Sequence, residues 1–360
     1  MKIKAINTYL QPFQLTRPYT IAYKTQTAVE NVIVEMWTDD GICGLGAASP
    51  AVEVTGETHE ATLTALHPDQ LSWCLNKDMR DFAALRQRCF LQLSKMPAAC
   101  AAVDIALHDL YAQMLDRPLV AVLGQCHQAL PTSITIGIKN VEETLKEASE
   151  YLERGFTHLK VKLGCDLQED IERIIALRKD YGSHITIRVD PNQGYALPDL
   201  NQFIESTDHL DIELIEQPLS VRDLEALCRL KEKDRKRIAL DESVLNHIDA
   251  YRALTTVRCG ILNIKLMKCG GIFEAQKIAA LAEAAQVKLM WGCMDESVIS
   301  IAAALHVAFS CPATQYIDLD GSLDLAEDVV AGGFKLEHGI LSPLDLPGLG
   351  LTRICGRKNV

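Results

Sequence analysis

Three acidic residues in the middle of the chain each end a run of apolar residues typical of a strand. They are Asp190, Glu216 and Asp241. Carboxylates at the ends of neighbouring parallel strands converge, and they repel one another unless a cation neutralises them. Oxygen ligands without histidine or cysteine favour Mg²⁺ over zinc. The sequence therefore predicts a Mg²⁺ site, and the alternative is that the three acids are unrelated helix caps.

Two lysines lie in another such run. Lys160 and Lys162 are two residues apart, so their side chains point to the same face of a strand. Such a pair is typical of a solvated edge strand. The spacing of the apolar runs described below predicts a closed barrel, in which a strand has no edge, and a buried lysine needs a reason. Mutual repulsion, a nearby divalent cation and partial burial all lower a lysine pKa. We therefore expect an amine here that is available as a general base.

A further lysine, Lys265, lies in the run Ile261–Leu266. In a ring of eight strands, this run faces the one that carries Lys160 and Lys162. A carboxylate substrate held by the metal would present its α-carbon between opposed amines. One amine would remove the α-proton and the other would return a proton to the opposite face. The arrangement predicts inversion at the α-carbon.

Two more acids, Asp318 and Asp320, share one face at the end of the last apolar run. Their position favours a role as the counter-charge for a substrate ammonium group. The alternative is that they cap a helix or form a salt bridge to the preceding module.

The elements that position these residues recur about every 25 residues, with amphipathic stretches between them. This period predicts a (β/α)7β TIM-type barrel of the α/β class, and the alternative is an open doubly wound sheet. The eight strand-like runs are Ser133–Ile138, His158–Leu163, Ile185–Asp190, Ile212–Glu216, Arg237–Asp241, Ile261–Leu266, Val287–Trp291 and Gln315–Asp320.

The remaining sequence lacks this period. We expect residues 1–125 to form an α+β capping domain, residues 126–321 to form the barrel, and residues 322–360 to pack back on the cap. An Asp-Asp-Gly turn follows Trp37 and indicates a hairpin. The expected strands of the cap are Lys2–Thr8 and Asn31–Trp37, and its expected helices are Glu57–Leu66 and Ala98–Met114.

Composition limits the class of protein. The 360 residues are 48% hydrophobic and carry a formal charge of −12, which argues for a soluble fold and against nucleic-acid or membrane partners. Twelve cysteines without a CxxC pair, and a start that does not resemble a signal peptide, favour a reducing cytoplasm. The sequence leaves the oligomeric state open, a homo-oligomer included.

Taken together, these motifs resemble the enolase superfamily in its muconate-lactonizing subgroup. The resemblance rests on Lys160 and Lys162, on the acidic triplet, and on the stretch Lys265–Gly271. The helix Ala98–Tyr111, with the Arg-Pro-Leu that follows it, is similar to that subgroup's junction of cap and barrel. The Asp-Leu-Asp at 318–320 narrows the resemblance to dipeptide epimerases, whose relatives include the L-Ala-D/L-Glu epimerases.

The resemblance implies a role for each of these groups. Asp190, Glu216 and Asp241 would bind one Mg²⁺, which chelates the C-terminal carboxylate of a small dipeptide. Lys162 and Lys265 would be the two acid/base catalysts, with Lys160 supporting Lys162 and the enolate. Asp318 and Asp320 would bind the dipeptide's α-ammonium group. The loops Thr16–Thr27 and Ser49–Glu57 would close over the site and contact the substrate side chains.

Side-chain preference stays open between Ala-Glu-like, cationic and hydrophobic dipeptides. Lys24 stands where glutamate-specific members carry arginine, and Lys lacks the bidentate geometry of that residue. Asp295 stands where an apolar residue is common, and it would favour a cationic or uncharged side chain. Its alternative role is to cap the helix Ser297–Ala308. Thr135, in the first barrel run, is a further candidate for substrate binding.

Three alternatives share parts of this pattern. An o-succinylbenzoate synthase or muconate cycloisomerase would use the same metal and lysines, as would an N-acylamino acid racemase. None of these needs a site for an ammonium group, so Asp318 and Asp320 argue against them. A non-catalytic binding protein on a decayed barrel would not be expected to keep all three lysines and all three acids.

Overall fold

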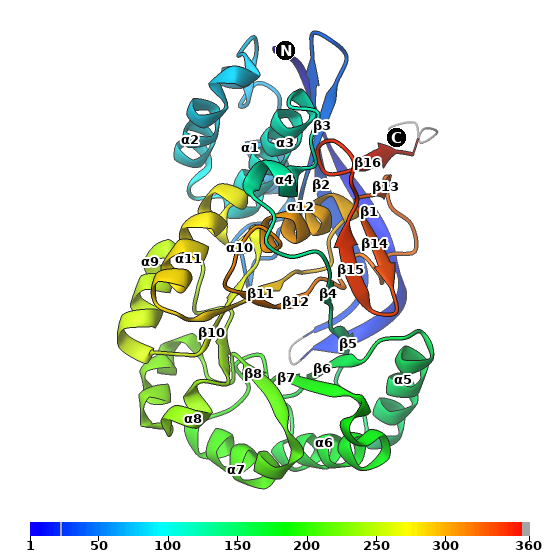
Figure 1. The fold of residues 1–360 in the computed structure, drawn as a ribbon, viewed down its shortest axis with the longest axis vertical. Coiled ribbons are helices and arrows are strands. Elements are labelled where there is room, and N and C mark those ends of the chain that lie inside the picture. Colours follow the sequence, from blue (N-terminus) through cyan, green and yellow to red (C-terminus); the bar gives the residue numbers. More distant parts are fainter. Residues whose placement is uncertain (22–23, 355–360) are drawn as a thin grey trace.

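The computed structural model describes residues 1–21 and 24–354, and it describes side chains for these residues except 17–26. Its centre is a sheet of eight parallel strands whose spatial order follows the chain (Figure 1). A parallel bridge between Thr132 and Ile317 brings the first strand to the last, so the sheet is a nearly closed barrel. The strands are β5 (Ile134–Ile136), β6 (His158–Lys162), β7 (Thr186–Asp190), β8 (Ile212–Glu216), β9 (Ile238–Leu240), β10 (Ile261–Ile264), β11 (Lys288–Gly292) and β12 (Thr314–Asp318). The predicted barrel is confirmed.

Helices cover the outside of the barrel in the order of the chain. Polar residues fix where several of them begin: Asn140 and Asp166 accept hydrogen bonds from backbone N–H groups of the first helical turn. The crossover between β8 and β9 is irregular, with a 3₁₀ segment at Val221–Arg229 and the short α8 (Glu232–Arg235). The other outer helices are α5 (Val141–Glu153), α6 (Leu167–Tyr181), α7 (Leu197–Thr207), α9 (His247–Arg252), α11 (Ile272–Ala284) and α12 (Val298–Ala308).

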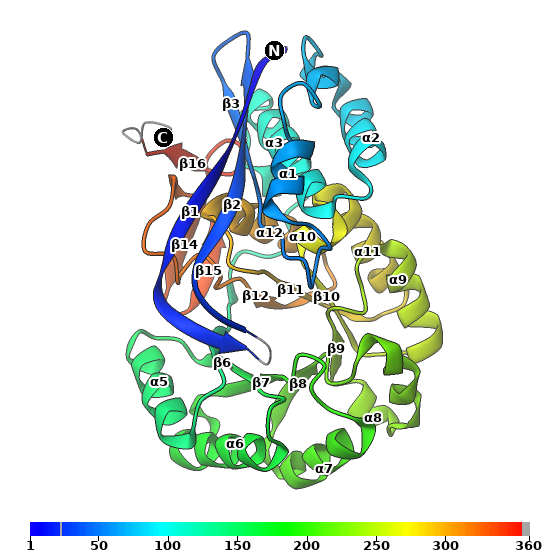
Figure 2. The ribbon, with the colours of Figure 1, turned by 180° about the vertical axis from the view of Figure 1, so that it is seen from behind.

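The N-terminal cap is a three-stranded antiparallel sheet with helices beside it (Figure 2). Its strands are β1 (Ile3–Ile21), β2 (Lys24–Thr38) and β3 (Cys43–Ala48), and its helices are α1 (His59–Ala65), α2 (Phe82–Leu93), α3 (Pro97–Met114) and α4 (Leu119–Leu123). The predicted hairpin turn is present, with Gly41 at φ 82°. Gly46 lets β3 approach α3, since a Cβ there would lie 1.8 Å from the carbonyl oxygen of Ala102.

Two features of the cap differ from the sequence prediction. The first strand is much longer than Lys2–Thr8, because its pairing with β2 continues as far as Ile21 and Lys24. Helix α2 was not predicted, although it buries Leu85, Cys89 and Leu93, which are four residues apart along one face.

The C-terminal segment contacts both parts of the molecule. Strands β14 (Phe334–Glu337) and β15 (Ile340–Pro343) form a sheet with β4 (Leu130–Pro131), which leads into the barrel. Strand β13 (Val330–Gly332) pairs with β16 (Leu351–Arg353), and Arg353 contacts Glu35 of the cap at 2.5 Å. The backbone N–H of Thr16 donates to the carbonyl of Asp324 at 2.7 Å. The segment thus ties the edge of the cap to the end of β12.

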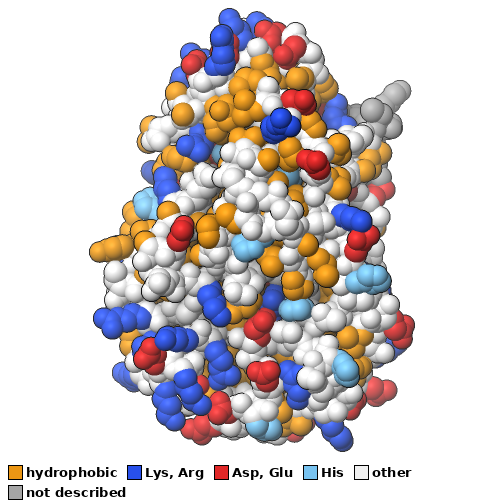
Figure 3. Space-filling model, viewed as in Figure 1, with side chains coloured by type: hydrophobic (Ala, Val, Ile, Leu, Met, Phe, Trp, Pro, Cys, Tyr) orange, Lys and Arg blue, Asp and Glu red, His pale blue; other side chains and the backbone are white. Residues whose placement is uncertain are grey.

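Two global properties bear on the predicted class of protein. Among the described residues, no helix is both long and apolar enough to cross a membrane. The eleven cysteines in the described part of the chain are all free thiols. On the face drawn in Figure 3, acidic and basic side chains lie interspersed.

Candidate active site

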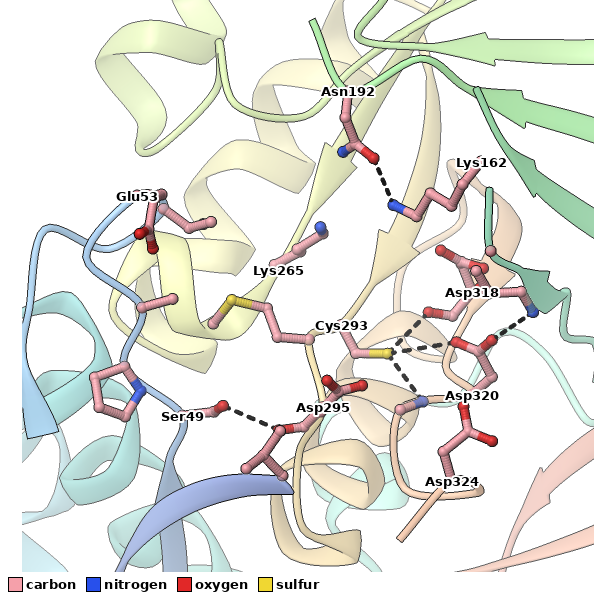
Figure 4. A pocket seen from close by; sticks show the side chains of 18 of the residues that line it. Ser49, Glu53, Lys162, Asn192, Lys265, Cys293, Asp295, Asp318, Asp320 and Asp324 are labelled. Atoms are coloured by element: carbon pink, nitrogen blue, oxygen red, sulfur yellow. Dashed lines mark hydrogen bonds between the residues drawn. The ribbon is translucent and has the colours of Figure 1, made fainter. Parts of the chain in front are cut away.

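A cavity of about 680 Å³ lies where the C-terminal ends of the barrel strands face the cap. Lys160, Lys162 and Lys265 line it from the barrel, and residues 49–54 line it from the loop after β3. Figure 4 shows the amines of Lys162 and Lys265 pointing into it from different sides. The volume is typical of a site for a small molecule.

The three strand-end acids are buried beneath this cavity. Asp190 and Glu216 are the last residues of β7 and β8, and Asp241 directly follows β9. Their exposed fractions are 0%, 0% and 2%. Since β7, β8 and β9 are adjacent in the sheet, the predicted convergence of the three carboxylates at one side of the barrel mouth follows from the topology.

Lys160 lies among three acids. Its Nζ donates a hydrogen bond to Asp318 Oδ2 at 2.8 Å. The same atom is 2.7 Å from Glu216 Oε2 and 3.2 Å from Asp190 Oδ2. The side chain is 4% exposed, so this ammonium is a buried charge compensated on several sides.

The other two predicted lysines each contact one of the three acids. Lys162 Nζ donates to Asp190 Oδ2 at 2.7 Å and to Asn192 Oδ1 at 3.0 Å. Lys265 Nζ donates to Asp241 Oδ2 at 2.8 Å. Lys265 was predicted to lie in the strand, but β10 ends at Ile264. Lys265 instead directly precedes the short helix α10 (Leu266–Cys269). Because β7, β8 and β9 lie between β6 and β10, the two lysines reach the cavity from opposite sides.

The ion pairs of the strand-end acids oppose the lowered pKa that was predicted for the pair Lys160 and Lys162, and Lys265 has a similar ion pair. Burial disfavours both ammonium groups, but adjacent carboxylates outweigh it. Asp318 and Glu216 hold the pKa of Lys160 well above its usual range, and Asp241 does the same for Lys265. The prediction considered the repulsion between lysines and a cation, and it omitted the direct ion pairs.

The carboxylates respond in different directions. Burial and the nearby Asp190 raise the pKa of Glu216 to about 7. For Asp190 burial acts in the same direction, but Lys162 and Lys160 overcome it and lower the pKa. Lys265 and Lys268 likewise outweigh burial and lower the pKa of Asp241. Perturbed carboxyl groups in a cavity are typical of a functional site.

The backbone is in the left-handed region directly after two of these acids. Asn192 and Gln193 follow Asp190 with φ values of 45° and 68°, and Gln217 follows Glu216 with φ 32°. Side chains other than glycine rarely adopt this region, so the fold holds these turns at a cost in free energy. The Gln217 side chain stabilises the next strand end, where its Oε1 accepts from the N–H of Asp241 at 3.0 Å.

Asp318 and Asp320 lie at the end of the cavity next to β5. Ser133 Oγ donates to Asp318 Oδ1 at 2.6 Å, and the backbone N–H of Thr135 donates to Asp320 Oδ2 at 2.8 Å. Asp318 is the last residue of β12 and Asp320 lies two residues beyond it. Thr135, which was predicted as a substrate-binding residue, lines the cavity. Its backbone N–H also fixes the position of the Asp320 carboxylate.

Asp295 and Lys24 were both predicted to set the side-chain preference, but the structure describes the side chain of Asp295 only. Asp295 lines the cavity, and its carbonyl accepts from Ser49 Oγ at 3.0 Å (Figure 4). Its alternative role as a helix cap is wrong, because α12 is capped by Ser297, whose side chain accepts from the N–H of Ile299. The side chain of Lys24 lies outside the described residues.

Sequence reasoning did not single out several cavity-lining acids and a thiol. Glu242 follows Asp241, and the sequence places it at a strand end, which is the signal that could have found it. Glu53 comes from the cap loop, and Asp324 and Cys293 come from the segments after β12 and β11. Burial and Asp320 keep the pKa of the Cys293 thiol well above its usual range. Glu53 belongs to the loop Ser49–Glu57 that was expected to close over the site, whereas for Asp324 and Cys293 only the tertiary fold reveals the location.

The residues at the strand ends fit a magnesium ion by their chemistry. The three carboxylates offer only hard oxygen atoms, and Glu216 Oε2 is buried without a hydrogen bond. Among the described residues, no three Asp, Glu, His or Cys side chains lie close enough together to coordinate one ion in this conformation. The ammonium of Lys160 lies between the acids instead, at the end of a flexible side chain.

Comparison with known families agrees with this geometry. Residues 143–353 match the enolase C-terminal domain-like family, and residues 5–124 match the N-terminal domain of the mandelate racemase/muconate lactonizing enzyme family. The chain belongs to the enolase superfamily.

Several of its similar relatives within the superfamily are named epimerases. An L-Lys-D/L-Arg epimerase of Desulforapulum autotrophicum is 54% identical over 98% of this chain and 100% of its own. The dipeptide epimerase of Methylococcus capsulatus, solved with Mg and the dipeptide L-Arg-D-Lys, is 52% identical over 98% and 99% of the two chains, with a TM-score of 0.96. The L-Ala-D/L-Glu epimerase of Bacillus subtilis, solved with substrate, is 36% identical over 98% and 99%, with a TM-score of 0.92.

Proposed function

We propose that this enolase-superfamily chain is a Mg²⁺-dependent dipeptide epimerase that prefers dipeptides with cationic side chains. The observation that carries the proposal is one cavity that two lysines enter from opposite sides, one on β6 and one directly after β10, above three buried strand-end carboxylates. The names of the similar relatives support it, including the Mg-bound complex with L-Arg-D-Lys.

Asp190, Glu216 and Asp241 would hold the metal. When bound, Mg²⁺ would attract the C-terminal carboxylate of the dipeptide and stabilise the negative charge that develops there as the α-proton leaves. The same carboxylate oxygens now contact Lys160, Lys162 and Lys265. Lys160, as the most enclosed of these ammonium groups, would remain as a fixed positive charge beside the reacting carboxylate.

Lys162 and Lys265 would carry the proton transfer. The α-carbon would lie between them, with one amine removing the proton from one face and the other ammonium donating to the opposite face. The reverse assignment of the two roles epimerises the other isomer. Asn192, which accepts from Lys162 at 3.0 Å, would keep that amine directed at the cavity.

Asp318 and Asp320 would bind the α-ammonium group of the N-terminal residue. A lyase acting on a carbocyclic acid, or a racemase of N-acylated amino acids, has no ammonium to place beside two buried carboxylates. Both acids line the cavity, and both are less than a tenth exposed. Their presence favours a free dipeptide over either alternative.

The charge of the cavity supports a cationic side chain on the substrate. Beyond the three lysines, no lysine or arginine among the described residues lines it, whereas Glu53, Asp295 and Asp324 do. A lysine or arginine side chain of a substrate would be attracted to a cavity-lining carboxylate such as Glu53, whereas a glutamate side chain would be repelled by it. This favours the L-Lys-D/L-Arg type of epimerase over the L-Ala-D/L-Glu type.

The experiment that tests this function is a dipeptide library incubated with the protein and Mg²⁺ in D₂O. We expect dipeptides that contain Lys or Arg to gain one deuterium at the C-terminal α-carbon and to epimerise fastest. Ala-Glu should be at least about tenfold slower, since one misplaced charge costs more than about 1.4 kcal/mol. Faster turnover of Ala-Glu would contradict the cationic preference, and no exchange with any dipeptide would contradict the epimerase itself.

The pH dependence of substrate binding provides a test of Asp320. Burial and the neighbouring Asp318 raise the pKa of Asp320 to about 7. Only its ionised form pairs with an ammonium group, so the KM of a dipeptide is expected to fall as the pH rises from 6 to 8. In Asp320→Asn this fall should disappear and KM should stay high. An unchanged pH profile in the variant would show that another group causes the dependence.

A further inference from the structure

The two oxygens of each strand-end carboxylate have different surroundings. Asp190 Oδ1 accepts from the backbone N–H of Asn192 at 2.9 Å, and Glu216 Oε1 accepts from Asn263 Nδ2 at 2.9 Å. The other oxygen of each acid, Asp190 Oδ2 and Glu216 Oε2, contacts the ammonium of Lys160. In both acids, one oxygen is therefore held by a fixed donor of the barrel and the other faces the centre of the site.

Asp241 has the same division. Its Oδ1 accepts from Lys268 Nζ at 2.5 Å, and its Oδ2 accepts from Lys265 Nζ at 2.8 Å. Lys265 lines the cavity and Lys268 does not, so the two lysines approach this carboxylate from different sides. Of the two Asp241 oxygens, Oδ2 is therefore the one that could bind an ion at the centre of the site.

Lys268 is fully engaged by the protein. Its side chain is 0% exposed, and Nζ donates to Asp241 Oδ1, to the Asp241 carbonyl at 2.5 Å and to the Asn263 carbonyl at 3.1 Å. An ammonium has three N–H donors, so none is left for a substrate. This geometry excludes direct participation in proton transfer and fits a residue that fixes the position of another.

Asn263 connects this anchor to the neighbouring acid. Its carbonyl accepts from Lys268, while its side-chain amide donates to Glu216. It is completely buried on β10, and its Oδ1 makes no hydrogen bond. Among the described residues, the Asn263 side chain therefore hydrogen-bonds through Nδ2 alone, and the acceptor is a strand-end carboxylate.

We propose that Asn263 and Lys268 are positioning residues that turn Glu216 Oε2 and Asp241 Oδ2 toward the metal. The inference rests on the proposed function. Without these donors each carboxylate can rotate, and the oxygen that faces the centre of the site is no longer fixed there. Substitution of a residue that donates a hydrogen bond to a metal-binding side chain usually weakens metal affinity by about 10- to 100-fold.

The test is calorimetric titration of Mg²⁺ into the wild type and into Asn263→Leu and Lys268→Met, without substrate. Lys268→Met keeps the approximate volume of the side chain, and Asn263→Leu keeps its branched shape. We expect Mg²⁺ to bind about 10-fold more weakly or worse in both. Lys268→Met also removes a positive charge that repels Mg²⁺. If charge alone mattered, the loss of this repulsion would tighten Mg²⁺ binding. The sign of the change thus separates positioning from simple charge compensation.

Lys277→Met is the matched control, because Lys277 forms a partly buried ion pair with Glu274 at 2.8 Å and does not line the cavity. It should leave Mg²⁺ affinity unchanged. Raising the Mg²⁺ concentration should restore much of kcat in Asn263→Leu, which a folding defect would not allow. If circular dichroism shows that Lys268→Met does not fold, Asn263→Leu, which changes no charge, decides alone.

The outcomes separate the inference from the proposed function. If the wild type binds Mg²⁺ and both folded variants bind it equally well or more tightly, the positioning role is overturned while the epimerase stands. If the wild type does not bind Mg²⁺, the proposed metal centre fails, and the positioning role fails with it.

Discussion

Lys162→Ala and Lys265→Ala are each expected to reduce epimerisation by about 10³-fold, because inversion needs a proton donor on one face of the α-carbon and an acceptor on the other. The two lysines reach the cavity from β6 and from the end of β10, with three strands between them. Removing either leaves one face of the substrate without a proton-transfer group. The rate is measured by polarimetry or by chiral chromatography of the product.

Deuterium exchange sharpens this expectation. Each variant keeps one amine, so it should still exchange the α-proton of one isomer with D₂O, and the two variants should exchange opposite isomers. Lys288→Ala is the matched control, since Lys288 begins β11 at the other end of the barrel and contacts Tyr316. Exchange of the same isomer by both active-site variants would mean that the lysines do not act on opposite faces.

The barrel could be predicted because its signals are local and repeated. The run His158–Leu163 corresponds to β6 within one residue. A short apolar or alternating stretch between two amphipathic helices is readily assigned to a strand, because the barrel buries its apolar side chains. The position of Asp190, Glu216 and Asp241 at strand ends followed directly, because a strand end is visible in the sequence once the strand is known.

The parts that could not be predicted depend on tertiary contacts. The pKa of Lys265 is set by the distance to Asp241, which no local pattern contains. The hydrogen bond from Asn263 to Glu216 joins β10 to β8, which are separated by β9 in the sheet, so no local pattern predicts it. Helix α2 was missed because only three of its twelve residues are buried, so its apolar periodicity is weak.

Glu216→Gln is expected to weaken Mg²⁺ binding beyond detection and to reduce epimerisation by about 10³-fold, since a metal commonly supplies several kcal/mol of transition-state stabilisation. The substitution keeps the shape of the side chain, and its amide oxygen can still accept from Asn263. What it removes is the negative charge at Oε2, the buried oxygen without a hydrogen bond. Metal affinity is measured by calorimetry and the fold by circular dichroism.

Glu242→Gln is the control that makes this result specific. Glu242 also lines the cavity, its Oε2 is also buried without a hydrogen bond, and burial together with Asp241 raises its pKa. It differs from Glu216 in following the strand-end acid rather than ending a strand, and the ion pairs of Lys160 in the described structure are with Asp190, Glu216 and Asp318. We expect Mg²⁺ binding to survive Glu242→Gln. If instead Glu242→Gln loses the metal and Glu216→Gln retains it, the ion is held one residue further along the chain after β9, and the strand-end triplet is not the ligand set.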